Sequence, residues 1–180
     1  MKQMKWLVAA LVFVMLIPAA MGAALITRGS SELAVDGNLD FASSAGTDFV
    51  IGGRYAYFFW DRLSLGTKVA FSDNDEITTF GIGLVGEYNF TMSPEYRPLI
   101  GTDFVPFIGM AVDYRYVDVP EKDENAFVGG LEAGCKFFLT DSAAVALSLL
   151  GEVASEKIYP DDHKLKRADL MIRLGMRFYF

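Results

Sequence analysis

The sequence predicts an all-β fold, an eight-stranded antiparallel up-and-down transmembrane β-barrel. Beyond residue 30, apolar and polar residues alternate in eight segments, and a period of two is typical of a strand with two unlike faces. Each segment is about ten residues long, the length of a transmembrane β-strand. A third observation is an N-terminal segment with the features of a secretory signal, which indicates export.

Composition and charge agree with an exported barrel. The 180 residues suit one domain, and 52% of them are hydrophobic, with a mean hydropathy of +0.28. The formal net charge is −7, and it becomes more negative once Lys2 and Lys5 leave with the signal. An acidic exported chain is a poor match for nucleic acid, so we expect no nucleic-acid partner.

We expect residues 1–24 to be a cleaved signal peptide and residues 25–180 to be the barrel domain. Lys2 and Lys5 precede an uncharged apolar run over residues 6–17, Pro18 ends it, and small residues follow. The cut is expected between Gly22 and Leu25. The alternative is an uncleaved anchor helix, which the signal reading outweighs because the apolar run before Pro18 is shorter than the ~20 residues that a spanning helix needs.

Residues 170–180 show the strand pattern most clearly. One alternating set is wholly apolar, while the other carries Arg173, Gly175 and Arg177. The tight connections 59–62 and 140–142 are expected at one end of the barrel and longer polar ones at the other, although the connector 91–104 breaks that rule. The expected strands are 31–41, 48–58, 63–72, 79–90, 106–116, 127–139, 143–154 and 170–180.

The polar face is predicted to line the interior. It is rich in glycine, alanine and serine, and the bore of an eight-stranded barrel is just wide enough to be filled by side chains. Its acids and bases are nearly balanced, as buried charges must be paired. A secreted lipocalin-like barrel, with the apolar set inward, is the alternative. The expected interior charge network, a structural one, comprises Asp36, Arg54, Lys68, Glu87, Asp113, Arg115, Glu132, Lys136, Glu152, Arg173 and Arg177, with Asp40 and Asp48 on the same face.

Aromatic residues of the apolar face are concentrated at the strand ends, with aliphatic residues between them. Two aromatic girdles around an aliphatic band are typical of a barrel that meets both lipid interfaces. One expected girdle contains Phe41, Phe49, Phe71, Phe80, Tyr114, Tyr116 and Phe127, and the other Tyr55, Tyr57, Tyr88, Phe90, Phe137, Phe178 and Phe180, with Trp60 in a turn.

Three stretches resemble the small outer-membrane barrels of the OmpA transmembrane-domain and OmpX type. They are residues 105–111, residues 134–141 and the terminal Arg177-Phe178-Tyr179-Phe180. The resemblance implies location in the outer membrane of a Gram-negative cell, contact with its lipid and lipopolysaccharide, and a monomer. It also implies that Phe178 and Phe180 form a signal read by the outer-membrane assembly machinery.

No catalytic, cofactor or metal site is expected. His163 is the one histidine, and Leu165 stands where the similar lipid A deacylases carry a serine two residues after their histidine. The acidic connections could hold divalent ions but suit a solvated rim equally well. We therefore expect a non-enzymatic barrel with a structural or surface-interaction role in the envelope. The alternatives are a narrow channel or binder of a small hydrophobic molecule, a lipid A-modifying enzyme, and the lipocalin-like carrier.

Overall fold

The computed structural model describes residues 26–40, 48–73, 78–90, 103–118, 124–161 and 164–180. The expected signal peptide and His163 lie outside these residues. Among the residues described, no helix is long and apolar enough to cross a membrane.

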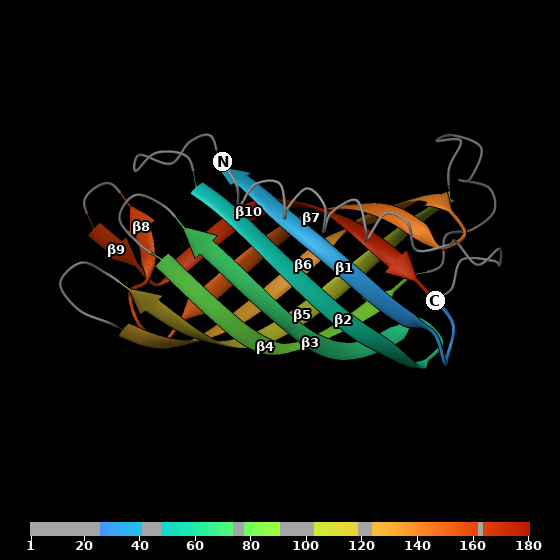
Figure 1. Ribbon diagram of the computed structural model, residues 1–180, viewed down its shortest axis with the longest axis horizontal. Coiled ribbons are helices and arrows are strands. Elements are labelled where there is room, and N and C mark those ends of the chain that lie inside the picture. The colour runs from blue at the N-terminus through green and yellow to red at the C-terminus, as the bar shows by residue number, and fades with distance from the viewer. Residues whose placement is uncertain (1–25, 41–47, 74–77, 91–102, 119–123, 162–163) are drawn as a thin grey trace, which may run out of the picture.

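Eight strands close into an antiparallel barrel, which confirms the expected fold (Figure 1). Seven of the eight strand pairs of the wall join wall strands that follow one another along the chain, and the first and last wall strands, β1 and β10, pair to complete the ring. A small hairpin, β8 (Tyr159–Asp161) and β9 (Lys164–Lys166), lies in the connection before the last strand. The wall strands are β1 (Ser31–Asp40), β2 (Asp48–Trp60), β3 (Leu63–Asp73), β4 (Thr78–Asn89), β5 (Asp103–Asp118), β6 (Glu124–Thr140), β7 (Ala143–Ala154) and β10 (Ala168–Tyr179).

The two ends of the barrel differ. Two-residue turns join β2 to β3 and β6 to β7 at the end where the chain finishes, whereas β8 and β9 lie at the opposite end (Figure 1). We call these the turn end and the hairpin end. At the turn end Arg62 adopts a positive φ of 70°, and a register shift precedes each tight turn, between Phe58 and Trp60 and between Phe138 and Thr140. Such shifts re-aim side chains where a strand ends.

The expected strand boundaries agree best at β7 and least at β5, which begins at Asp103 rather than at Pro106. The carbonyl of Pro106 accepts a hydrogen bond from the Phe90 backbone N–H at 2.8 Å on the β4 side. The missing N–H of proline lies on that same side, where the β4 ladder has already ended at Asn89 opposite Phe107. Proline is therefore tolerated inside this strand.

Charged and small side chains point into the barrel and apolar side chains point out. On β7, Ala144, Ala146 and Glu152 are buried, whereas Leu147 and Leu149 are each 48% exposed. This arrangement is the reverse of a lipocalin, whose apolar set fills the interior, so the lipocalin-like alternative is wrong. An apolar exterior needs a surrounding that is itself apolar.

Exposed aromatic side chains mark both margins of the apolar exterior. At the turn end the Tyr55 and Phe180 ring centroids lie 6.5 Å apart, and at the hairpin end those of Tyr114 and Phe127 lie 5.3 Å apart. Phe137 and Phe178 are half-buried, and nothing is described for the side chains of Phe41 and Phe49. The exposed members are Tyr55, Tyr57, Trp60, Tyr88, Phe90 and Phe180 at the turn end and Phe71, Phe80, Tyr114, Tyr116 and Phe127 at the hairpin end.

Candidate functional site

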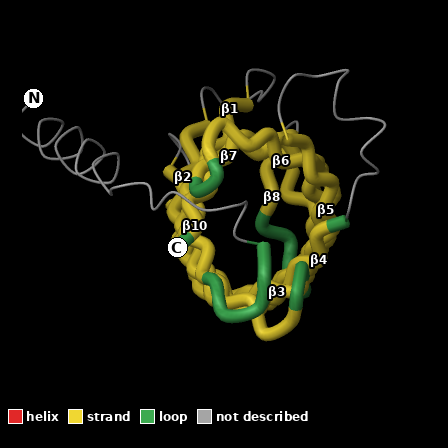
Figure 2. The backbone as a smooth tube through the Cα atoms, turned by 90° about the vertical axis from the view of Figure 1, so that its right-hand side faces the viewer, coloured by secondary structure: helices red, strands yellow, loops and turns green. Residues whose placement is uncertain are grey.

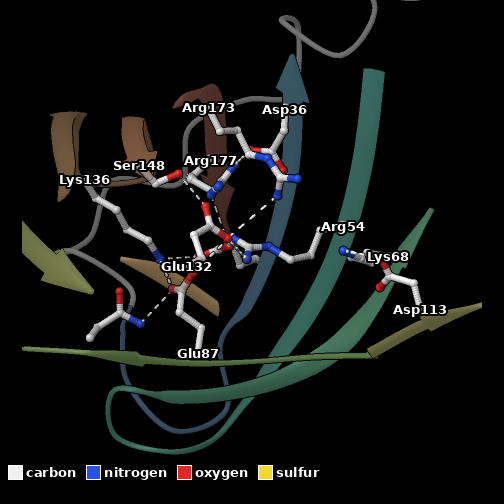
Figure 3. Close-up of polar contacts among 12 residues, drawn as sticks. Asp36, Arg54, Lys68, Glu87, Asp113, Glu132, Lys136, Ser148, Arg173 and Arg177 are labelled. Carbon is white, nitrogen blue, oxygen red and sulfur yellow. Dashed lines mark hydrogen bonds and ion pairs between the residues drawn. The ribbon is translucent and has the colours of Figure 1, made fainter. Parts of the chain in front are cut away.

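The bore contains a set of ion pairs, and Arg54 stands at its centre (Figure 3). Arg54 projects inward from β2 because it alternates with the outward Tyr55. Its Nη2 lies 3.0 Å from Glu32 Oε1 and 3.0 Å from Glu87 Oε2, and its Nη1 lies 3.9 Å from Glu132 Oε2. One guanidinium thus links carboxylates from β1, β4 and β6, and its planar fork suits several acceptors at once.

Lys136 on β6 joins two of the same carboxylates from the other side. Its Nζ lies 2.7 Å from Glu32 Oε2 and 2.5 Å from Glu87 Oε1, and its side chain is fully buried. The ammonium also lies 5.3 Å from the ring centroid of Phe107 and 5.4 Å from that of Tyr179. Aromatic faces attract a cation, so Lys136 is held by charge on one side and by rings on the other.

Arg177 on the last strand extends the network across the barrel seam. It donates a hydrogen bond to Asp36 on β1, and its Nε lies 3.6 Å from Glu32 Oε1. Gly175 gives this pair its room, since a Cβ there would lie 2.7 Å from Arg177 Nη1 and would also clash with the Asp36 carboxylate. The pairing therefore depends on a glycine two residues before the arginine.

Glu132 completes this group. Ser148 donates a hydrogen bond to it at 2.5 Å, and Arg173 Nη1 lies 3.8 Å from its Oε2. We call the connected set the turn-end cluster. Its members are Glu32, Asp36, Arg54, Glu87, Glu132, Lys136, Arg173 and Arg177.

A smaller group, the hairpin-end cluster, consists of Lys68, Asp113, Arg115 and Glu152. Asp113 Oδ2 lies 2.7 Å from Lys68 Nζ and 2.9 Å from Arg115 Nη2. Glu152 Oε1 lies 2.5 Å from Arg115 Nη2 and 3.9 Å from Lys68 Nζ. Each acid therefore meets both bases.

Each cluster is electrically neutral. The turn-end cluster has four acids and four bases, and the hairpin-end cluster has two of each. Burying a charge is tolerated when it is paired and hydrogen-bonded. Such a pairing fills the described bore with side chains whose charges balance one another.

Apolar side chains cover both ends of the bore. At the turn end Ile26 packs against Phe58, Phe138, Ala144 and Tyr179, and the Ile26 carbonyl accepts a hydrogen bond from the Arg62 N–H at 3.0 Å. At the hairpin end, a buried group lies over the mouth. It comprises Val117, Ala126, Val128, Ala154, Ile158 and Tyr159. In the view along the barrel the chain near β8 lies within the outline of the ring (Figure 2).

The structure places all eleven residues of the expected charge network in the bore. It also adds participants that the sequence reasoning missed, among them Glu32, Tyr159 and Asn89, whose amide donates a hydrogen bond to Glu87 at 3.0 Å. Glu32 lies in the same alternating set as Asp36, so the signal was present. Tyr159 lies beyond the alternating segments, and no sequence signal could have found it. No side chain is described for Asp40 and Asp48.

Comparison with known proteins supports the same architecture. A family model described as "Outer membrane protein beta-barrel domain" matches residues 7–178. The chain belongs to this family of outer-membrane β-barrels. A search of curated proteins found no match.

Solved outer-membrane barrels share the fold at low sequence identity. The N-terminal β-barrel domain of Pseudomonas aeruginosa OprF is 18% identical, with a TM-score of 0.63 over 85% of this chain and 98% of that one. Neisserial surface protein A (NspA) is 15% identical, with a TM-score of 0.52 over 84% and 95%. The outer membrane protein OprG from Pseudomonas aeruginosa is 14% identical, with a TM-score of 0.51 over 88% and 99%. Likeness at this level supports the fold alone.

As a member of this family, the barrel is assigned to the outer membrane, with its aliphatic band in the hydrocarbon region and its aromatic margins at the interfaces. Phe180 is 52% exposed at the turn end. Among the residues described, no group of three or more histidine, cysteine, aspartate or glutamate side chains could hold a metal ion.

Proposed function

We propose that this chain is a non-enzymatic, non-conducting outer-membrane barrel with a structural role in the envelope, where it serves as a rigid scaffold for its surface connections. The observation that carries the proposal is the charge network of the bore. Its members pair with one another across the barrel, and apolar side chains cover both ends. A bore filled by mutually neutralising side chains supports stiffness rather than transport.

A channel would need a continuous wet path, and Arg54 and Lys136 lie across that path. Their side chains are 4% and 0% exposed and together engage Glu32 and Glu87. Moving either one would leave carboxylates unpaired in a buried setting, which is costly. We therefore favour the structural role over the channel alternative.

Flux through proteoliposomes tests this proposal directly. Vesicles that contain the folded barrel should swell in small sugars no faster than protein-free vesicles, and planar bilayers should show no steps of conductance. The matched variant Arg54→Ala shortens a side chain that crosses the bore and serves as a positive comparison. Swelling by the unchanged protein above the protein-free rate would overturn the non-conducting role.

The envelope role has its own test. Loss of the chain from its source bacterium should increase sensitivity to detergent with a chelator, and expression of the unchanged chain should restore resistance. Mass spectra of lipid A should be identical with and without overexpression. A lost or added acyl chain would favour the lipid A-modifying alternative.

The proposal includes the route to the membrane. Residues 1–24 would be removed on export, residues 25–180 would form the barrel as a monomer in contact with lipid and lipopolysaccharide, and the assembly machinery would read Phe178 and Phe180. The exposed position of Phe180 at the turn end supports such a reading. N-terminal sequencing of the mature protein would locate the cut.

A further inference from the structure

The connection that follows β7 folds back over the mouth of the barrel. Ser155, Glu156 and Lys157 are exposed, but the next two residues are buried, Ile158 at 6% and Tyr159 at 7% exposure. A surface connection has little reason to bury two large side chains in succession. These two side chains therefore occupy a packing site that the barrel wall provides.

That place is formed by inward-facing residues near the hairpin end of three wall strands. Val117 of β5, Val128 of β6 and Ala154 of β7 are each buried and contact the same apolar group as Ile158 and Tyr159. Polar side chains at these positions would keep the mouth wet. Apolar side chains at these positions exclude water, and burial of Ile158 and Tyr159 against them is favourable.

The Tyr159 hydroxyl reaches past this apolar group to the hairpin-end cluster. It donates a hydrogen bond to Glu152 Oε2 at 2.9 Å and accepts one from Arg115 Nη1 at 3.3 Å. The Arg115 guanidinium also lies 5.9 Å from the ring centroid of Tyr159. Burial, followed by the negative charge of Glu152, raises the pKa of Tyr159, so the phenol keeps the proton that it donates.

The ion pairs of the hairpin-end cluster do not depend on Tyr159, although Glu152 Oε2 accepts its hydrogen bond from that residue. Arg115 pairs directly with both Glu152 and Asp113, and Lys68 pairs with Asp113 at 2.7 Å. Withdrawal of the phenol would leave four charges that still neutralise one another. The turn-end cluster differs, because withdrawal of Lys136 or Arg54 would break ion pairs.

We propose that residues 155–159 form a reversible cap on the hairpin end. The side chains of Ile158 and Tyr159 close the mouth by packing in it, and the hydrogen bond from the Tyr159 hydroxyl to Glu152 holds the cap closed. When the cap lifts, water and small solutes reach the hairpin-end cluster. The turn-end cluster stays closed beneath it, so an open cap does not make a channel.

Cysteine protection tests the cap. Cys135 is the single cysteine, so a Cys135→Ser background leaves only the reporter thiol. Val128→Cys places that thiol beneath the cap, at a position 1% exposed, and Ala146→Cys places it deeper in the bore, also 1% exposed. The folded variants are held in lipid nanodiscs, their heat-modifiable gel mobility is verified, and the rate of reaction with a charged maleimide is measured.

In this background Val128→Cys should react slowly. Adding Tyr159→Phe removes only the hydroxyl and its hydrogen bond to Glu152. It should raise the reaction rate of the Val128→Cys thiol about tenfold, as expected for the loss of a hydrogen bond to a charged group. Tyr159→Ala should raise the rate further, because it also removes the aromatic ring that packs in the mouth. The control Tyr114→Ala, an outward-facing tyrosine at the same end, should leave the rate unchanged.

Three results would overturn the cap. Val128→Cys could react as fast with Tyr159 intact as without it, or stay protected when Tyr159 is phenylalanine or alanine. Ala146→Cys could become reactive together with Val128→Cys, which would mean that the entire bore opens. Because Tyr159→Phe keeps the ring and its packing, it tests the hydrogen bond to Glu152 even if Tyr159→Ala fails to fold.

Discussion

Replacement of Lys136 by methionine removes the ammonium from between Glu32 and Glu87 while keeping most of the side-chain volume. The two ion pairs are 2.7 and 2.5 Å long, and the side chain is fully buried. Removing one partner of a buried pair typically costs about 3–5 kcal/mol. Arg54 remains 3.0 Å from both carboxylates, so we expect about 3 kcal/mol, the lower end of that range.

The measurement is the free energy of unfolding in urea, with the barrel in phospholipid vesicles and the folded fraction read from gel mobility. Lys166→Met is the matched control. Lys166 also forms an ion pair, 3.2 Å from Asp169 Oδ1, but its side chain is 40% exposed. Solvent screens such a pair, so its loss should cost less than about 1 kcal/mol.

A double-mutant cycle separates the ion pair from other effects of the substitution. Glu87→Gln removes one carboxylate charge that Lys136→Met leaves in excess. The double variant should therefore lose less free energy of unfolding than the sum of the two single losses, by at least about 1 kcal/mol. The reasoning would be refuted if Lys136→Met proved no more destabilising than Lys166→Met, or if the cycle were additive.

Three further predictions concern the wall of the barrel. Leu174→Arg, on the lipid face, should destabilise by about 2–4 kcal/mol, whereas Ala146→Gly in the bore should cost less than about 1 kcal/mol, and similar urea midpoints would argue against the assigned faces. Gly175→Ala should cost about 1–3 kcal/mol by crowding Arg177 and Asp36. Gly129→Ala, where a Cβ would meet nothing within 4 Å, should be nearly neutral, and an equal loss would count against crowding. Deletion of Phe180 should lower the yield of folded barrel in outer-membrane fractions, and an unchanged yield would remove its role in assembly.

Much of the fold follows from local pattern. The period of two assigns each side chain of a strand to one face, so the outward Leu174 and the inward Arg173 could be separated before any partner was known. Strand ends were harder to predict. The sequence predicts that Pro106 begins its strand, because proline interrupts ladders. The β5 edge at that point lies beyond the β4 ladder, however, and that relation exists only in the assembled sheet.

Partners within the bore depend on distances along the chain that no local pattern contains. Glu32 and Lys136 are 104 residues apart, and they meet only because β1 and β6 belong to one closed ring and both side chains point into its bore. The alternation indicated that acids and bases would share the interior. Which acid meets which base depends on register and on side-chain length, and Tyr159 reaches the bore from outside the alternating strands altogether.

The two clusters differ in how firmly burial holds them. At the turn end Lys136 and Arg177 have fully buried side chains and that of Arg54 is 4% exposed, with Arg173 the more exposed base at 17%. At the hairpin end Lys68 and Arg115 keep 11% and 12% exposure. Since the penalty for an unpaired charge grows with burial, rearrangement is cheaper at the hairpin end. Neutrality within each cluster means that a change in one leaves no charge for the other to balance. Motion inside this barrel should therefore begin at the hairpin end and stop short of Arg54.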